Sequence, residues 1–185
     1  MNKIAQLGIS ALAALSATAA VPDRAAAEPT SMFILDASGS MWGRLPERQS
    51  KITAARTLMG RLVGELPQSV AAGSIASGHR RTGDCPDTEV LREATPGGGA
   101  AIAAQHPRQV PRGTTPISDA LLLAAQRLKG IEDRTTIVLV SDGIETCKGD
   151  PFAVAAALAE ASPQLNIHVV GYAVDARTRA QLQCV

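Results

Sequence analysis

The amino-acid sequence predicts an α/β fold built on a largely parallel β-sheet with helices on both faces. Three apolar runs, residues 32–36, 135–142 and 166–174, are continuous and β-branched rather than alternating. A strand has this composition when both of its faces are covered, because neither side meets water. Segments with helical patterns lie between these runs, and strands that alternate with helices are typical of parallel sheets.

The first residues, 1–27, are predicted to be a signal peptide. A short basic start, "MNK", precedes an apolar stretch at 4–21, and Ala25 and Ala27 form an A-x-A pattern before Glu28. There are two alternatives. Cleavage could follow the earlier A-x-A pattern of Ala17 and Ala19, or the segment could be an N-terminal membrane anchor. We expect an exported protein, periplasmic or secreted, with no membrane span once the signal is removed.

The first half of the remaining chain, after the strand at 32–36, predicts one long helix and two weaker strands. Residues 51–66 place leucines and Ile52 near one helical face. Residues 69–77 are a weaker strand candidate, and 88–93 is a candidate short edge strand.

The second half begins with a glycine- and proline-rich loop at 94–113, in which a short helix is expected at 100–105. Residues 116–130 predict a helix, because proline favours its first turn and glycine its end. Further helices are predicted at 150–161 and, with an aspartate as its N-cap, at 175–184.

Length and composition limit the functional classes. The chain has 185 residues, enough for one ordinary domain over residues 28–185. The formal net charge is +1 and aromatic residues make up 2% of the chain, so neither a basic surface nor a base-stacking surface is expected. We therefore expect no nucleic-acid partner.

Polar residues follow the predicted strands at the edge where α/β sheets bind ligands. Asp36, Ser38 and Ser40 end the first strand, Asp142 ends the strand at 135–142, and Thr115 precedes a helix. In extended chain, every second side chain points the same way, so the first three can converge. Carboxylates and hydroxyls are ligands for a hard cation; Mg²⁺ is favoured, with Ca²⁺ or Mn²⁺ as alternatives. With no histidine, cysteine or lysine in the motif to act as nucleophile or base, this chemistry favours binding over catalysis.

These motifs resemble a known family. "DASGS", "GTTPISDAL" and "LVSDGIET" are similar, in this order, to the three parts of the metal-ion-dependent adhesion site of von Willebrand factor A domains. The resemblance spans residues 32–184, and "SGSMWG", "GHRRTGDC" and "SDGIETC" resemble a bacterial exported subgroup. It implies a Rossmann-like three-layer sandwich whose mostly parallel sheet has one antiparallel edge strand, which residues 88–93 fit.

The resemblance also implies a ligand set. Ser38 and Ser40 would bind the divalent cation directly, and Asp36 and Asp142 would bind it directly or through water. Thr115 would be the hydroxyl ligand that shifts between the liganded and unliganded states. An Asp or Glu carboxylate from a protein partner would complete the coordination shell.

Some residues near this site have alternative interpretations. Thr114 replaces Thr115 as the ligand if the loop register differs. Trp42, beside the first motif, is either a partner-contacting aromatic or a packed lid. His79 and Arg80, after the strand at 69–77, either contact an anionic partner or form a solvated basic turn.

The sequence departs from the family pattern in two places. The family usually adds a further strand and helix beyond the point where this sequence stops, so one sheet edge is expected to be bare. Phe152 stands where this subgroup is expected to carry a second cysteine after "ETC".

Three cysteines allow at most one disulfide within the chain. Cys85 and Cys147 both follow strand ends on the ligand side, so we hypothesise that they pair, which leaves Cys184 as the odd one. An exported protein meets the oxidising conditions in which such a bond persists.

The sequence thus predicts a non-enzymatic, exported module that captures an acidic group of a partner through a divalent cation. The alternatives are a metal-dependent hydrolase or phosphatase with Asp36 as nucleophile, a chelatase-like subunit, and a structural fragment that binds no metal. Phosphatases of that kind typically carry a second acid two residues on, where this chain has Ser38.

Overall fold

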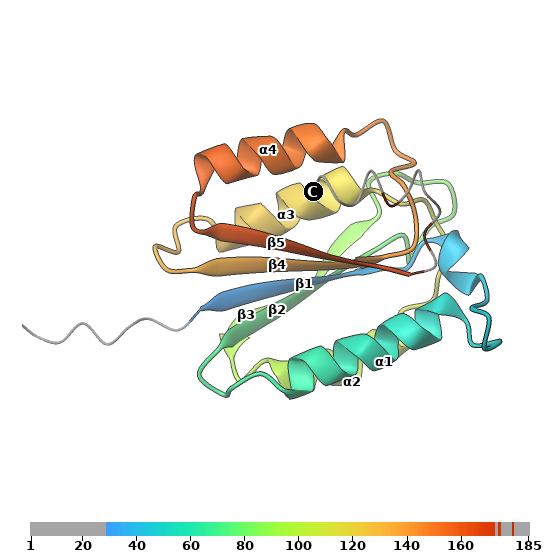
Figure 1. Ribbon diagram of the computed structural model, residues 1–185, viewed down its shortest axis with the longest axis horizontal. Helices are drawn as coiled ribbons and strands as arrows, with labels where there is room; N and C mark the ends of the chain where they lie inside the picture. The colour runs from blue at the N-terminus through green and yellow to red at the C-terminus, as the bar shows by residue number, and fades with distance from the viewer. Residues whose placement is uncertain (1–28, 173, 175–178, 180–185) are drawn as a thin grey trace, which may run out of the picture.

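The computed structural model describes residues 29–172 together with residues 174 and 179 (Figure 1). The strands are β1 (Thr30–Asp36), β2 (Ala71–Ser77), β3 (Thr88–Pro96), β4 (Thr135–Ser141) and β5 (Leu165–Gly171). The α-helices are α1 (Lys51–Gly64), α2 (Gly99–Gln105), α3 (Ile117–Leu128) and α4 (Pro151–Ala161), and two 3₁₀ turns are η1 (Gly39–Trp42) and η2 (His106–Arg108). The helix predicted at 175–184 lies, apart from residue 179, outside the described residues.

The five strands form one mixed sheet in the order β3-β2-β1-β4-β5. β1, β2, β4 and β5 run parallel, and β3 pairs antiparallel with β2 at one edge. The predicted α/β class with one antiparallel edge strand is therefore confirmed, and that strand continues three residues beyond the predicted 88–93. In the described part of the chain, β5 forms the other edge of the sheet.

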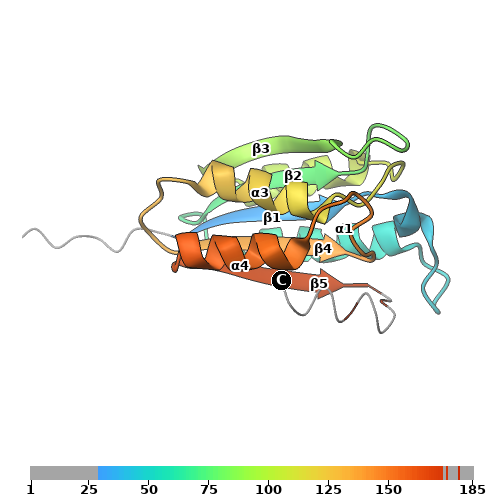
Figure 2. The ribbon, with the colours of Figure 1, turned by 90° about the horizontal axis from the view of Figure 1, so that it is seen from above.

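Helices cover both faces of the sheet, as the alternation of elements predicts. α1 and α2 lie on one face, and α3 and α4 lie on the other (Figures 1 and 2). One buried cluster joins the sheet to α3 through Met32, Ile34 and Leu121. The second cluster joins it to α1 and α2, with Phe33 and Ile52 among its members. Because successive residues of β1 alternate between the two clusters, both of its faces are buried.

The strand β2 is fully paired, although its sequence is only weakly apolar. A Cβ at Gly73 would lie 2.7 Å from the backbone nitrogen of Ala94 and 2.9 Å from the side chain of Met32. The backbones approach so closely here that there is no room for a side chain. Small residues in β2 thus reflect close packing rather than poor strand propensity.

The helix starts are capped in different ways. The Ser50 side chain accepts a hydrogen bond from the Thr53 N–H at the start of α1, and Asp150 accepts from Phe152 and Ala153 at the start of α4. No helix among residues 29–172 combines the length and the apolar character needed to cross a bilayer.

Candidate metal centre at the carboxyl ends of the strands

Two acidic residues meet where β1 and β4 end. The two strands run parallel in register up to Leu35 and Val140, so Asp36 reaches the same level as Ser141. The Ser141 hydroxyl donates to Asp36 Oδ2 at 2.5 Å. Asp142 follows directly, and its side chain is fully buried. Parallel pairing thus brings together carboxylates that are more than one hundred residues apart in the chain.

The turn after β1 links the serines to both carboxylates. The Ser38 N–H donates to Asp36 Oδ1 at 2.8 Å, and the Oγ atoms of Ser38 and Ser40 lie 3.0 Å apart. The Ser40 hydroxyl donates to Asp142 Oδ1 at 2.7 Å. The η1 turn buries Met41 in the core, which fixes the turn against the sheet. Asp36, Ser38, Ser40 and Asp142 therefore form one continuous polar chain.

Thr115 approaches this chain from the loop before α3. A Cβ placed on Gly143 would lie 3.4 Å from Thr115 Oγ1 and 3.6 Å from Ser40 Oγ. The hydroxyls of Thr115 and Ser40 therefore face the same small space beside Gly143. The Gly39 N–H donates to the Gly113 carbonyl at 2.9 Å and holds the threonine loop against the serine turn.

Glycine is required at position 113. A Cβ there would lie 2.4 Å from the carbonyl oxygen of Arg81, much closer than side-chain carbons normally come. Gly113 also donates to the Gly78 carbonyl at 2.8 Å. The "G" of the "GTTP" motif thus serves close packing of two loops, and this packing positions the threonines that follow.

The two carboxylates sit in different environments. Asp36 is 1% exposed, and this burial raises its pKa to about 6, against the opposing effect of hydrogen bonds from Ser141 and Ser38. Asp142 instead forms an ion pair, because Lys51 Nζ lies 2.6 Å from its Oδ2. Lys51 is a site residue that sequence reasoning missed. A lysine as the first residue of a helix, where the dipole disfavours positive charge, is the signal that could have found it.

The donor set suits a hard cation. All five predicted ligands offer oxygen, and a positively charged ammonium group already contacts one of them. Among the residues that the structure describes, no three His, Cys, Asp or Glu side chains gather into a group that could hold a metal. A cation here would therefore depend on hydroxyl oxygens for most of its protein ligands.

Glu145 organises the far side of the threonine loop, and sequence reasoning did not single it out. Its Oε2 accepts from the Ser118 N–H at 2.8 Å, and its Oε1 accepts from the Cys147 N–H at 2.7 Å. Pro116 is the N-cap of α3 and offers no capping side chain. A carboxylate from the β4–α4 loop therefore caps the helix that begins after Thr115.

The three residues considered for partner contact lie in different surroundings. Trp42 is 55% exposed, and its indole N–H donates to the Pro111 carbonyl at 2.9 Å. His79 is buried and hydrogen-bonds Glu89. The Arg80 guanidinium donates to Asp87 Oδ1 at 2.7 Å. Of the three, Trp42 offers the most open surface, whereas His79 and Arg80 are engaged within the domain.

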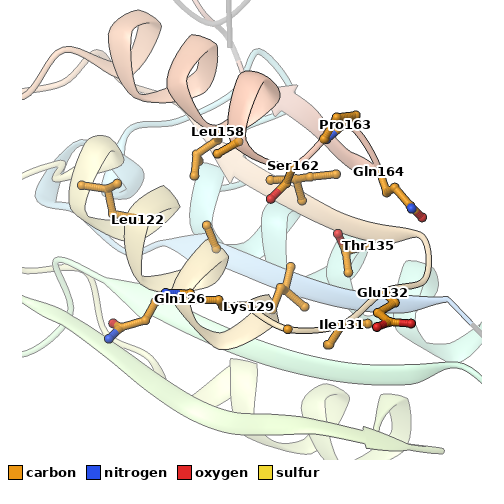
Figure 3. A pocket seen from close by; sticks show the side chains of 15 residues that line it. Leu122, Gln126, Lys129, Ile131, Glu132, Thr135, Leu158, Ser162, Pro163 and Gln164 are labelled. Atoms are coloured by element: carbon orange, nitrogen blue, oxygen red, sulfur yellow. The ribbon is translucent and has the colours of Figure 1, made fainter.

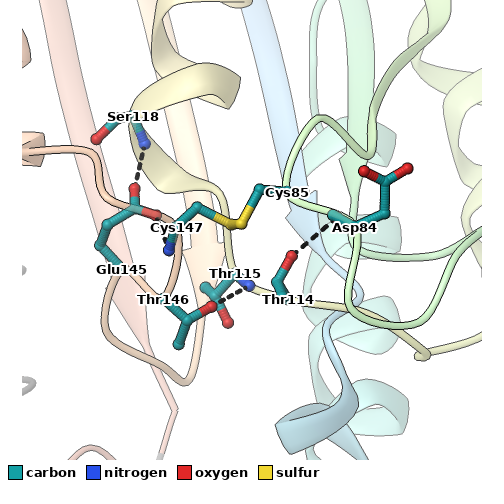
Figure 4. The surroundings of a disulfide bond; sticks show 8 residues. All are labelled: Asp84, Cys85, Thr114, Thr115, Ser118, Glu145, Thr146 and Cys147. Carbon is teal, nitrogen blue, oxygen red and sulfur yellow. Dashed lines mark hydrogen bonds between the residues drawn. A yellow bond between two sulfur atoms is a disulfide. The ribbon is translucent and has the colours of Figure 1, made fainter.

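The structure joins Cys85 and Cys147 by a disulfide with a Cα–Cα distance of 5.5 Å (Figure 4). Cys85 lies in the β2–β3 loop and Cys147 in the β4–α4 loop. The bond therefore connects two loops on the ligand side of the sheet. Cys184 lies outside the described residues.

The threonine loop is hydrogen-bonded to both of the loops that the disulfide joins. The Thr114 hydroxyl donates to the Asp84 carbonyl at 3.0 Å (Figure 4). The Thr115 N–H donates to Thr146 Oγ1 at 2.7 Å, and the Thr146 N–H returns a bond to the Thr115 carbonyl. The Thr114 hydroxyl thus ties the threonine loop to the β2–β3 loop, whereas the Thr115 hydroxyl lies near Gly143 and Ser40.

A pocket of about 590 Å³ lies at the opposite end of the strands (Figure 3). It is lined by the C-terminal halves of α3 and α4 and by the first residues of β4 and β5, including Leu122, Leu158 and Leu165. Its lining is mainly apolar and contains none of the predicted ligands. The candidate metal centre lies at the other end of the strands, separate from this pocket, and Ser40 is the exposed member of its five predicted ligands.

Comparison with known proteins identifies relatives of the fold. A family model for the von Willebrand factor type A domain matches residues 31–145. The uncharacterised protein YwmD from Bacillus subtilis (strain 168) is 25% identical over 195 residues, which cover 99% of this chain and 86% of YwmD.

Solved structures share the fold at low sequence identity. The pilus adhesin SpaC from Lactobacillus rhamnosus GG superposes with a TM-score of 0.66 at 15% identity, over 85% of this chain and 27% of SpaC. Proximal thread matrix protein 1 from the mussel byssus, solved with zinc in its MIDAS motif, gives a TM-score of 0.62 at 18% identity, over 85% of this chain and 38% of that one. The chain thus spans well under half of either protein. It belongs to the von Willebrand factor type A domain family.

Proposed function

We propose that this protein is an exported adhesion-type module that captures an acidic group of a partner protein through a divalent cation. The observation that carries the proposal is the continuous chain of oxygen atoms from Asp36 through Ser38 and Ser40 to Asp142, with the Thr115 hydroxyl facing Ser40 across Gly143. These donors come from three separate segments, and the fold brings them together at the carboxyl ends of β1 and β4.

Ser38, Ser40 and Thr115 would supply neutral hydroxyl ligands, and Asp36 and Asp142 would supply the negative charge, directly or through water. A bound Mg²⁺, or Ca²⁺ or Mn²⁺ in its place, acts as a Lewis acid that attracts a further anionic ligand. Both oxygens of Asp36 already accept hydrogen bonds within the protein, which favours contact through water for this residue.

The same hydrogen bonds support binding rather than catalysis. A nucleophilic aspartate needs a free and accessible oxygen, whereas Asp36 is 1% exposed and has both oxygens bonded. Phosphatases that use a nucleophilic aspartate carry a second acid two residues later, but this chain has Ser38 there. The Ser38 N–H instead donates a hydrogen bond to the Asp36 carboxylate. The hydrolase alternative therefore has less support.

The surroundings of the site suit a protein partner. Trp42 and Val110 are both exposed large apolar side chains, and Trp42 bonds to Pro111, the neighbour of Val110. Apolar surface beside a metal would add contact area around a captured Asp or Glu carboxylate. Likeness in fold to a pilus adhesin agrees with this role, and a disulfide agrees with a periplasmic or secreted location.

Metal binding by the exported protein tests the proposal. Isothermal titration calorimetry with Mg²⁺ and Mn²⁺ should show one site, and Ser38→Ala/Ser40→Ala should abolish it. Ser69→Ala, at an exposed serine in the α1–β2 connection, is the matched control and should bind normally. The partner arm uses an immobilised acidic peptide, which should retain the protein with metal and release it with chelator. Equal heats for the wild type and the double variant would contradict the proposal.

A further inference from the structure

We infer that Lys51 is a built-in competitor for the divalent cation, whose ammonium group neutralises Asp142 in the metal-free protein and lowers the metal affinity of the site. This inference deepens the proposed function and rests on it. It assigns a role to a residue that lies outside the adhesion-site motifs and 91 positions before its partner in the chain.

The contact itself is short and shielded. Lys51 Nζ lies 2.6 Å from Asp142 Oδ2, and the side chains are 17% and 0% exposed. The other carboxylate oxygen of Asp142 accepts from Ser40. An unpaired carboxylate with this burial would be strongly destabilising, so the metal-free fold needs a cation here. Lys51 supplies it from within the chain.

The position of Lys51 is costly by local criteria. It is the first residue of α1, where the helix dipole favours acidic side chains and opposes basic ones. Helix formation alone therefore gives no reason for a lysine at this place. The ion pair with Asp142 gives one, because the first turn of α1 faces the serine turn.

The neighbouring loop is shaped around the lysine stem. The Lys51 N–H donates to the Gly43 carbonyl at 2.8 Å. A Cβ on Gly43 would lie 3.2 Å from Lys51 Cε and 3.0 Å from the Ser40 carbonyl oxygen. Glycine at this position thus lets the lysine stem pass beside the backbone of Ser40. Packing on this stem and the ion pair at its end both direct the ammonium group into the site.

The chemical consequence is competition. If a divalent cation at Asp142 displaces the ammonium group, the ion pair is lost. If the ammonium group stays close, the two positive charges repel one another. Metal affinity is therefore lower than the oxygen ligands alone would give. Removal of the charge at position 51 should raise the affinity, while a distant lysine should have no effect.

The test compares Mg²⁺ and Mn²⁺ dissociation constants by calorimetry for the wild type, Lys51→Met and Lys51→Gln. Methionine keeps the apolar stem, and glutamine keeps a hydrogen-bond donor in case the methionine variant does not fold. Both neutral variants should bind metal about tenfold more tightly. Lys51→Arg, which keeps the charge, and Lys129→Met, at the exposed end of α3, should stay within about twofold of the wild type.

Thermal unfolding supplies a second readout. In chelator, Lys51→Met should melt below the wild type, because Asp142 loses its counter-charge, and saturating Mg²⁺ should remove the difference. Tight binding by Lys51→Met when the wild type shows none would also support competition. Equal metal affinity in the wild type and both neutral variants would overturn the inference and leave the proposed function intact. Absence of binding in every variant would overturn both.

Discussion

Removal of the disulfide should destabilise this domain more than most single changes. The bond closes a loop between residues 62 positions apart. In the chain-entropy model, a loop of this length restricts the unfolded chain by about 14 cal/mol/K, which corresponds to about 4 kcal/mol at 25 °C. Domains of this size are stable by about 5–15 kcal/mol in total, so the loss is a large share.

The same change should also weaken metal binding at the proposed site. The disulfide joins the two loops to which Thr114 and Thr115 are hydrogen-bonded, on either side of the threonine segment. Without it, those loops separate more easily and the Thr115 hydroxyl is less well fixed. We expect weaker Mg²⁺ binding together with lower stability, and the two effects should be seen in the same variant.

Urea unfolding of Cys85→Ser/Cys147→Ser, followed by circular dichroism, measures the stability. The fluorescence of Trp42, the single tryptophan of the chain, provides a second probe. Cys184→Ser is the matched control, because it removes a cysteine and leaves the disulfide. An unfolding free energy within about 1 kcal/mol of the wild type would refute the loop-closure reasoning. Two free thiols at Cys85 and Cys147 under non-reducing conditions would refute it more directly.

Three further predictions concern other parts of the fold. Burial, with a smaller effect of Arg56, lowers the pKa of His106 from 6.5 to about 4. The unfolded chain therefore takes up a proton first, so this contribution to stability is present above pH 6.5 and is lost as the pH falls toward 4. About 2.5 kcal/mol of this contribution is lost between pH 7.5 and pH 4.5. Asp36, whose pKa is raised to about 6, gains stability over the same range, so the test is the difference in unfolding free energy between the wild type and His106→Phe, measured by urea unfolding at both pH values. Leu121→Ala should cost about 2–5 kcal/mol in thermal or urea unfolding, because Leu121 is fully buried between α3 and the sheet. Gly113→Ala should destabilise by about 1–3 kcal/mol and weaken Mg²⁺ binding in calorimetry, because its Cβ would lie 2.4 Å from the Arg81 carbonyl oxygen.

Each of these has an outcome that would contradict it. The same difference in unfolding free energy between the wild type and His106→Phe at pH 7.5 and at pH 4.5 would mean that His106 is not buried in its neutral form. Wild-type stability in Leu121→Ala would place that side chain outside the core. Unchanged metal binding in Gly113→Ala would mean that the close packing at Gly113 does not determine the position of Thr115.

Much of the fold is visible in the sequence because strand burial leaves a local signal. Residues 137–140 are apolar throughout, and they form the middle of a central strand between β1 and β5. β2 gave a weak signal in part because Gly73 is required by the close approach of β3, which is a property of the folded sheet. Local pattern cannot report a contact that exists only after the strands have paired.

The candidate site was predictable where its residues end strands, and not where they arrive from elsewhere. Asp36 and Asp142 follow apolar runs, and parallel topology brings such ends together. Lys51 contacts Asp142 over 91 positions, and Glu145 caps a helix 27 positions earlier. The segment of Glu145 reads as an ordinary loop, and the one local signal at Lys51 is a basic residue in the first turn of a helix, which does not name its partner. Their roles depend on how the loops pack, which no periodicity encodes.

The wide spacing of the candidate metal ligands along the chain would link cation binding to the folding equilibrium. The donors at positions 36–40, 115 and 142 adjoin one another only in the folded protein. A cation present at one hundred times its dissociation constant would therefore favour the folded state by about 2.7 kcal/mol, which is close to a hundredfold fewer unfolded molecules. Resistance to proteases would then rise and fall with the supply of divalent ions around the protein.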